Sequence, residues 1–105
     1  MENQTSVNPG QVDPLVSVFG HDAFHEPVYI VGNIEGIRKL YFACATALQL
    51  QGEAVVPVFV NDGEGYDLHV SVDSRLNMYD GKYAVPYTAD YAKEQRECAI
   101  YPWTR

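Results

Sequence analysis

Residues 28–51, VYIVGNIEGIRKLYFACATALQLQ, decide the fold, because they combine a short strand with a long helical pattern. Val28 to Val31 is a run of β-branched and aromatic residues, which is typical of a strand. Asn33 follows and is a preferred residue for capping a helix N-terminus. The sequence therefore predicts a helix from about Ile34 to Gln51, ending at Gly52.

One side of this helix is apolar and the other is mixed. The large apolar residues recur at helical spacing, so we expect them to face the protein core. We call five of these residues the helix stripe, and Leu40 and Ala47 flank it: Ile34, Ile37, Tyr41, Cys44 and Leu48. Phe42 points toward the opposite side, beside Arg38. An outward Phe indicates a second buried surface, so we predict that Arg38 and Phe42 contact another copy in a homo-oligomer.

The segments on either side of the helix have strand patterns. Val12 to Phe19 is a candidate first strand. Glu53 to Val60 is nearly continuously apolar, and Pro57 within it favours an edge strand because proline cannot donate a ladder hydrogen bond. Asn61 to Gly65 has hairpin-turn chemistry. Residues 66–73 then alternate between apolar and polar, as expected for a strand with one face packed and one face open.

The C-terminal part has a different character. Asn77 to Tyr79 and Lys82 to Val85 flank Asp80-Gly81, which is the signature of a tight hairpin. A short helix is predicted over Asp90 to Glu97, and an extended aromatic segment follows it at residues 101–103. The sequence thus predicts an aromatic-rich C-terminal hairpin and tail.

Length and composition fit one α+β domain spanning residues 1–105, with residues 1–10 as a loose N-terminal arm. The hydrophobic fraction of 47% and the charged fraction of 20% are those of a globular protein. We expect a small antiparallel-rich sheet packed on one main helix. Cys44 and Cys98 form no CxxC motif, which favours a reducing, cytoplasmic compartment. The absence of a signal-peptide pattern or a long apolar stretch predicts no membrane association.

The charge is strongly acidic and unevenly distributed. The formal net charge is −7, which argues against DNA or RNA as a partner because binding to phosphates requires a basic surface. Residues 1–74 contain two basic and ten acidic residues, whereas residues 75–105 contain five basic and four acidic ones. The last third of the chain is therefore expected to present a different electrostatic surface.

No residue pattern identifies a catalytic or metal centre. His21 and His25 have a spacing that binds zinc on a helix, but their segment is not helical by pattern and no third ligand is evident, so a polar loop is favoured. The loop from Asp62 to Gly65 lacks the spaced oxygen ligands of a calcium loop. His69 is interpreted as a surface residue of a strand. We therefore expect a binding protein without cofactor or metal rather than an enzyme; a small enzyme is the weakest alternative.

The strongest candidate for a binding site is the group of aromatic and basic residues in the C-terminal tail. Residues 75–105 contain six of the 13 aromatic residues and five of the seven basic ones. Arginine offers a forked set of donors to phosphate, and an aromatic ring offers a face on which a base can stack. This pairing suits a small nucleotide. The alternative is that the tyrosines pack a second layer over the sheet, and composition alone leaves both interpretations open.

The run VYIVGNIEGIRKLYFACATAL, followed by VNDGEGYDLHVSV, resembles the small phage anti-Thoeris proteins. The resemblance covers about residues 10–73 and rests on the strand, the Gly-Asn-x-Glu-Gly helix start and the DGEGY hairpin. Proteins of this family are sponges that sequester the cyclic ADP-ribose isomer made as an immune signal by bacterial TIR-domain proteins. Small bacterial immunity proteins share the same motifs, so an inhibitor of a toxin or effector protein is the alternative.

The resemblance also carries expectations about assembly and ligand binding. It implies a phage protein acting in the host bacterial cytoplasm as a homo-oligomer, either a dimer or a hexamer. It implies a cyclic nucleotide ligand, a cyclic ADP-ribose isomer first and cyclic dinucleotides second, enclosed by arginines and an aromatic ring near contacts between copies. The tail residues of suitable type are Arg75, Tyr79, Arg96, Trp103 and Arg105.

Overall fold

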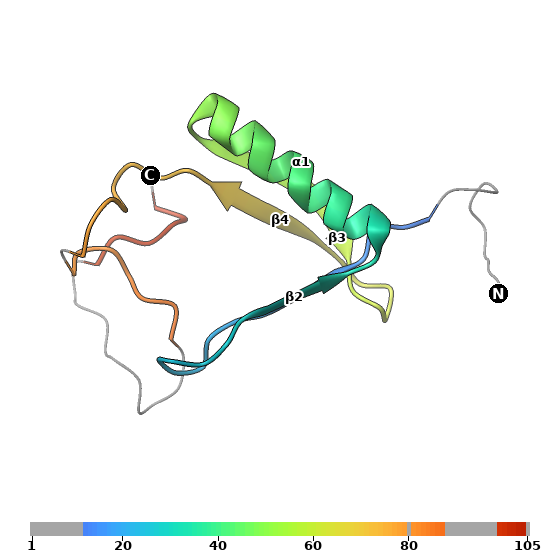
Figure 1. Ribbon diagram of the computed structural model, residues 1–105, viewed down its shortest axis with the longest axis horizontal. Helices are drawn as coiled ribbons and strands as arrows, with labels where there is room; N and C mark the ends of the chain where they lie inside the picture. The colour runs from blue at the N-terminus through green and yellow to red at the C-terminus, as the bar shows by residue number, and fades with distance from the viewer. Residues whose placement is uncertain (1–11, 80, 88–98, 105) are drawn as a thin grey trace.

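One long helix and two pairs of antiparallel strands form the described part of the protein (Figure 1). The computed structural model describes residues 12–79, 81–87 and 99–104. In chain order the elements are β1 (Val16–Phe19), β2 (Tyr29–Gly32), α1 (Ile34–Leu50), β3 (Glu53–Phe59) and β4 (Gly65–Ser71). β1 pairs with β2, β3 pairs with β4, and α1 lies along the β3–β4 pair. The predicted α+β class, with a small antiparallel sheet on one main helix, is confirmed.

Small side chains bring α1 close to the β3–β4 pair. Ala43 and Ala47 of the helix and Ala54 of β3 are buried together, with Val56 and Val70 packed at the edge of this cluster. Short side chains at the contact let a helix approach a sheet closely. Among the described residues, the largest fully buried side chains are valines, at positions 16 and 58. The core is therefore thin.

The expectation that the helix stripe faces the core is wrong. Ile34, Tyr41 and Leu48 are 74%, 66% and 68% exposed. Cys44, which belongs to the same stripe, is exposed as well. The buried side of α1 consists of Gly36 and the two alanines of the core cluster, on a different side of the helix. Helical spacing correctly grouped the large apolar residues on one side, but the sheet packs against the small residues beside them.

Asn33 joins the start of α1 to the segment before β1. Its Oδ1 accepts hydrogen bonds from the backbone N–H of Gly36 at 2.7 Å and of Leu15 at 3.0 Å. Its Nδ2 donates to the carbonyl oxygen of Asp13 at 2.9 Å. Asn33 is therefore the predicted helix cap, and it also holds a chain segment distant in sequence.

Two glycines allow the same segment to pass against the helix start. A Cβ atom on Gly32 or on Gly36 would overlap the backbone of Leu15. Side chains are excluded at both positions because backbone atoms occupy the space they would need. The Gly-Asn-x-Glu-Gly motif thus has a structural role, in which the glycines make room for Leu15 and the asparagine binds it.

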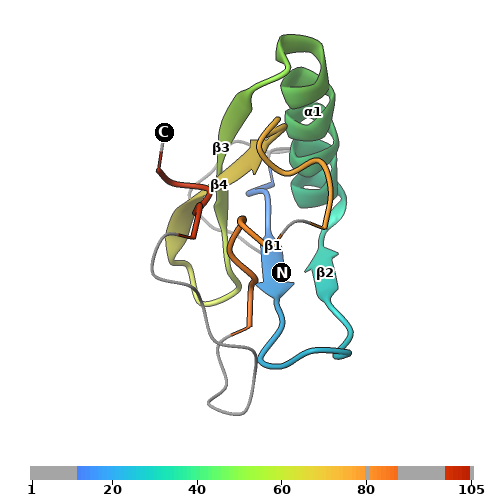
Figure 2. The ribbon, with the colours of Figure 1, turned by 90° about the vertical axis from the view of Figure 1, so that its left-hand side faces the viewer.

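β1 and β2 form a ribbon in which β1 contacts β3 and the end of β2 continues into α1 (Figure 2). The backbone N–H of Phe59 donates to the carbonyl oxygen of Pro14 at 2.9 Å, and Leu15 forms a single parallel bridge with Phe59. The Tyr66 hydroxyl donates to the carbonyl oxygen of Val16 at 2.6 Å. All four residues of β2 are exposed. The ribbon therefore lies largely outside the core.

Up to the end of β4, most predicted element bounds are close to those observed. After β4 the described residues form no further strand, and the segment predicted to be extended at residues 101–103 contains a turn. The helix ends one residue earlier than predicted, with Gln51 in the left-handed conformation as its C-cap. Pro57 pairs with Asp67 of β4. Among the described residues, the other edge of β3 has a single bridge, between Phe59 at its end and Leu15, so Pro57 lies in an edge strand as predicted. β1 is shorter than predicted. The N-terminal arm, Asp80 of the predicted second hairpin and the predicted short helix lie outside the described residues. No helix in the described part of the chain is long and apolar enough to cross a membrane.

Candidate ligand-binding surface

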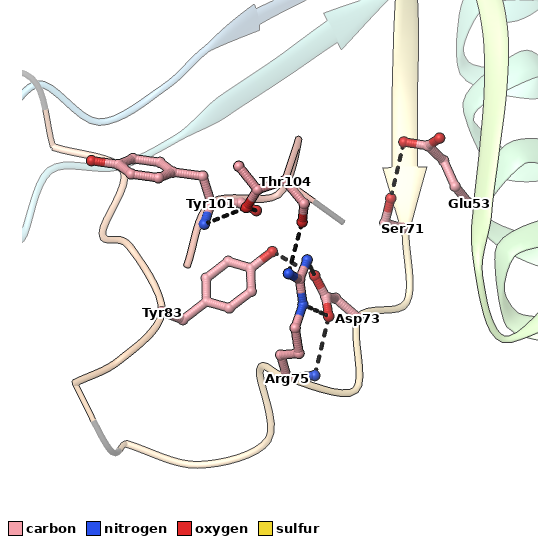
Figure 3. A network of polar contacts seen from close by, with 7 residues as sticks. All are labelled: Glu53, Ser71, Asp73, Arg75, Tyr83, Tyr101 and Thr104. Atoms are coloured by element: carbon pink, nitrogen blue, oxygen red, sulfur yellow. Dashed lines mark hydrogen bonds and ion pairs between the residues drawn. The ribbon is translucent and has the colours of Figure 1, made fainter. Parts of the chain in front are cut away.

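Asp73 and Arg75 form a closely coupled pair immediately after β4 (Figure 3). The Asp73 Oδ1 accepts from the backbone N–H of Arg75 at 3.1 Å and from its Nε at 2.8 Å. A guanidinium nitrogen of Arg75 also donates to Asp73 Oδ2 at 2.6 Å. The carboxylate is thus bound in the two-pronged geometry that arginine favours. Asp73 is 8% exposed and Arg75 is 32% exposed at the side chain.

Two residues of the C-terminal part complete this network, which we call the Asp73 clamp: Asp73, Arg75, Tyr83 and Thr104. The Tyr83 hydroxyl donates to Asp73 Oδ2 at 2.9 Å. The other terminal nitrogen of Arg75 donates to the carbonyl oxygen of Thr104 at 2.7 Å. The Arg75 guanidinium carbon also lies 5.9 Å from the centre of the Tyr83 ring, within cation–π range. The clamp therefore ties the C-terminal part to the end of β4.

The clamp has a defined electrostatic state. Hydrogen bonding from the Arg75 side chain holds the pKa of the Asp73 carboxyl well below its usual range, with further lowering from the Arg75 backbone N–H and the Tyr83 hydroxyl. Partial burial opposes this shift but is outweighed. The same pairing raises the pKa of Arg75. Both groups are therefore charged at neutral pH, and each largely neutralises the other.

The clamp supports a pair of aromatic rings near the C-terminus, which we call the tail pair: Tyr101 and Trp103. Their rings are stacked, with centres 5.0 Å apart and planes 20° from parallel. The turn between them is closed by Thr104, whose hydroxyl donates to the carbonyl oxygen of Tyr101 at 2.7 Å. A parallel bridge between Tyr83 and Ile100 holds the preceding residues. Trp103 remains 75% exposed, so its ring is available for contact.

The structure brings some of the predicted ligand-binding residues together. Arg75 binds the residue next to Trp103, so these two predicted positions belong to one local structure. Tyr79 is fully exposed, at 109%. Arg96 and Arg105 lie outside the described residues. Arg75 differs from the expectation in one respect, because its charge is already paired with a carboxylate.

Sequence reasoning did not identify Asp73 or Thr104 as part of this surface. A local signal for Asp73 exists, since the side chain of an Asp can accept a hydrogen bond from the backbone N–H of the residue two positions later, here an arginine, and so form a turn. No local signal exists for Thr104, whose contact with Arg75 spans 29 positions. The link between β4 and the tail is a property of the folded chain.

The histidines contribute no comparable cluster. The His21 ring meets the Tyr87 ring edge-on with centres 5.5 Å apart, while His25 packs against Phe24. The Glu26 carboxylate accepts from the backbone N–H of Asp22 at 3.1 Å. Within the described ranges, no three metal-ligating side chains come together.

A Ser, a His and a carboxylate do meet on the open face of the β3–β4 pair. His69 Nδ1 lies 2.9 Å from Glu53 Oε2, and the Ser71 hydroxyl donates to the same oxygen at 3.4 Å, a bond also drawn in Figure 3. The carboxylate therefore lies between the other two groups. In a Ser-His-Asp triad the His is between the Ser and the carboxylate, so this order differs from that of an acyl-transfer site.

Comparison with known proteins yields no match to a protein-family model, a curated protein or a solved structure. The function is therefore inferred from the surface described above and from the sequence resemblance.

Proposed function

We propose that this protein is a non-enzymatic sponge that binds and sequesters a cyclic ADP-ribose-type signalling nucleotide, and that it thereby blocks Thoeris defence in a phage-infected bacterium. The observation that carries the proposal is the exposed tail pair held beside Arg75 by the Asp73 clamp. The resemblance of residues 10–73 to the anti-Thoeris proteins supports it independently.

The tail pair is suited to base stacking. An adenine placed on the free face of Trp103 would extend the existing stack on Tyr101, and stacking on an aromatic residue contributes about 1–3 kcal/mol per base. The ring is held in place before the ligand arrives, which lowers the conformational entropy cost of binding. A stack alone does not break bonds, so this arrangement favours capture of the ligand over turnover.

Binding of the diphosphate requires positive charge beyond Arg75. Because Asp73 pairs with Arg75, we assign Arg75 mainly to holding the tail in place. Arg96 and Arg105, predicted from sequence, are then the groups that would pair with the phosphates. Their planar guanidinium groups match phosphate geometry.

A thermal-shift experiment with cyclic ADP-ribose isomers tests the proposal. A nucleotide present at about 100 times its Kd stabilises the folded protein by about 2.7 kcal/mol. For a chain of this size that corresponds to a rise in Tm of roughly 10–20 °C. A sponge also releases the nucleotide intact when the complex is heat-denatured, whereas an enzyme releases a product. The proposal fails if neither a cyclic ADP-ribose isomer nor a cyclic dinucleotide raises Tm.

A second candidate function is inhibition of a toxin or effector protein. It is favoured by the exposed, apolar helix stripe on an acidic chain. A basic target would be attracted at long range, so association would weaken as salt is added. A stable complex with such a protein in the absence of nucleotide, recovered by pull-down, would favour this function over the sponge.

A further inference from the structure

In the part of the chain that the structure describes, the helix stripe forms an exposed apolar surface along α1. Its members Ile34, Tyr41 and Leu48 are each about two-thirds exposed or more, and Ile37 is 41% exposed. None of the five stripe residues carries a charge. Contiguous apolar surfaces of this kind mark interaction sites.

The surface continues onto the β1–β2 ribbon. The Ile37 Cδ1 lies 3.2 Å from the position a Cβ on Gly32 would take, so the stripe meets the end of β2. Alternate residues of a strand share a face, which places Ile30 on the same side as Gly32. Val18 is the cross-strand partner of Ile30, and the two are 49% and 50% exposed. Helix and ribbon together therefore present one apolar face.

We propose that this face is the docking site for a second copy of the same chain, with the two α1 helices packed antiparallel. Apolar residues alternately three and four positions apart are the pattern by which two helices interlock side chains. In an antiparallel pair centred on Tyr41, Ile34 of each copy lies opposite Leu48 of the other. The surface is then self-complementary, as a two-fold interface must be.

The charges on α1 favour the antiparallel arrangement. The last turn of α1 has no basic residue to balance the partial negative charge of its carbonyl end. In an antiparallel pair, the partially positive N-terminal end of the partner helix lies beside this carbonyl end. A parallel arrangement would instead place Arg38 beside Arg38 and Glu35 beside Glu35.

The residues predicted from sequence as oligomer contacts lie beside this face, rather than on the opposite side of the helix as we expected. The Phe42 ring meets the Tyr41 ring edge-on, with centres 5.3 Å apart, and Phe42 is 56% exposed. Arg38 binds Glu35 at 2.9 Å on the same exposed side of the helix. Both fit the rim of the interface, whereas the stripe forms its centre.

The available area matches what a stable dimer needs. Complete burial of an aromatic side chain covers about 150–250 Å², so Tyr41 and Phe42 together contribute on the order of 250 Å². Five aliphatic residues of the face, each roughly half exposed, contribute a similar area. Since about 65% of a homodimer interface is apolar, roughly 500 Å² of apolar surface implies an interface of about 750 Å² per copy. Specific interfaces bury about 800 Å² per partner.

This inference does not depend on the proposed function, and its test measures mass rather than ligand binding. Light scattering at about 100 µM should give at least twice the chain mass of 11.8 kDa. Leu48→Lys places a charge in the interface and should weaken self-association by about 100-fold or more. Leu50→Lys is the matched control, because Leu50 is equally exposed at 66% but points to another side of α1.

A wild-type protein that stays at the single-chain mass overturns the proposal and assigns the face to a different protein. Equal association of Leu48→Lys and Leu50→Lys overturns it too, because the stripe would then lie outside the contact.

A crosslinking experiment keeps the proposal testable if Leu48→Lys does not fold. In a background in which Cys44 and Cys98 are replaced by serine, Tyr41→Cys should form a covalent dimer under mild oxidation, because position 41 lies on the two-fold axis. In the same background, restoring Cys44 alone should give little covalent dimer, since the two Cys44 positions are about 9 Å apart along antiparallel helices. Crosslinking at position 44 but not at position 41 would contradict the antiparallel arrangement.

Discussion

Replacing Asn33 with alanine removes three hydrogen bonds at the junction of α1 with the segment before β1. The lost acceptor Oδ1 serves the backbone N–H groups of Gly36 and Leu15, and the lost donor Nδ2 serves the carbonyl oxygen of Asp13. Unlike an ordinary helix cap, Asn33 therefore stabilises a local element and a contact across 18 positions at once.

The expected cost follows from these contacts. Loss of an N-cap side chain costs about 1 kcal/mol. The part-buried hydrogen bond from Leu15 adds about 1 kcal/mol, and the exposed one to Asp13 adds about 0.5 kcal/mol. Asn33→Ala should therefore lower the free energy of unfolding by about 2–3 kcal/mol, which corresponds to a drop in Tm of roughly 10–20 °C.

Asn33→Asp is the matched control, because it keeps the acceptor for Gly36 and Leu15 and puts a negative charge at the helix N-terminus. It loses only the donor to Asp13, so its cost should be about 1 kcal/mol or less. Urea denaturation followed by circular dichroism measures both variants. The reasoning is refuted if Asn33→Ala is within about 0.5 kcal/mol of wild type, or if Asn33→Asp is as unstable as Asn33→Ala.

Three further variants test other parts of the structure. Asp73→Asn should lower Tm at pH 7 because it breaks the clamp. Since the pKa of Asp73 is lowered in the folded state, the difference in Tm between this variant and wild type should persist down to about pH 4 and shrink only at lower pH. Gly36→Ala should lower the free energy of unfolding, measured by urea denaturation, by about 1–3 kcal/mol because its Cβ would overlap Leu15. Gly20→Ala is the control and should be close to neutral, since no atom lies near the position of its Cβ. Tyr79→Ala should leave Tm unchanged because its ring is fully exposed, but should weaken nucleotide binding in calorimetry by about 1–3 kcal/mol; an unchanged affinity would remove Tyr79 from the site.

Local signals in the sequence were sufficient to predict most of the secondary structure. Asn33 caps α1 as its residue type indicated, and its position set the start of the helix correctly. Pro57 occupies an edge strand because it has no N–H to donate. β1 begins later than predicted, at Val16. The residue before it, Leu15, has its backbone N–H and carbonyl groups bound to Asn33.

The burial of the helix could not be predicted in the same way. Helical spacing shows which residues share a side, but not whether that side meets the protein's own sheet or another surface. The larger apolar residues, such as Ile34 and Leu48, suggested the core side, whereas the sheet packs against Ala43 and Ala47. Small residues gave a weaker hydrophobic signal, although they permit the closest contact.

The sequence predicted which types of residue form the candidate site, but not how these residues are arranged. The enrichment of the tail in aromatic and basic residues indicated a binding surface, and Arg75 and Trp103 do belong to one local structure. The pairing of Arg75 with Asp73 changes its expected role from binding phosphate to positioning the tail.

Calorimetric titration with cyclic ADP-ribose isomers, comparing wild type with Trp103→Ala and Trp103→Phe, tests the central claim most directly. The wild-type protein should bind one of these nucleotides and release it intact. Trp103→Ala should weaken binding by about 1–3 kcal/mol, up to roughly 150-fold in Kd, while Trp103→Phe should retain most of the affinity because a ring face remains. Phe19→Ala, which removes an aromatic ring that is 58% exposed in β1, should bind as wild type does. Equal affinities for wild type and Trp103→Ala would contradict the assignment of the ligand to the tail pair.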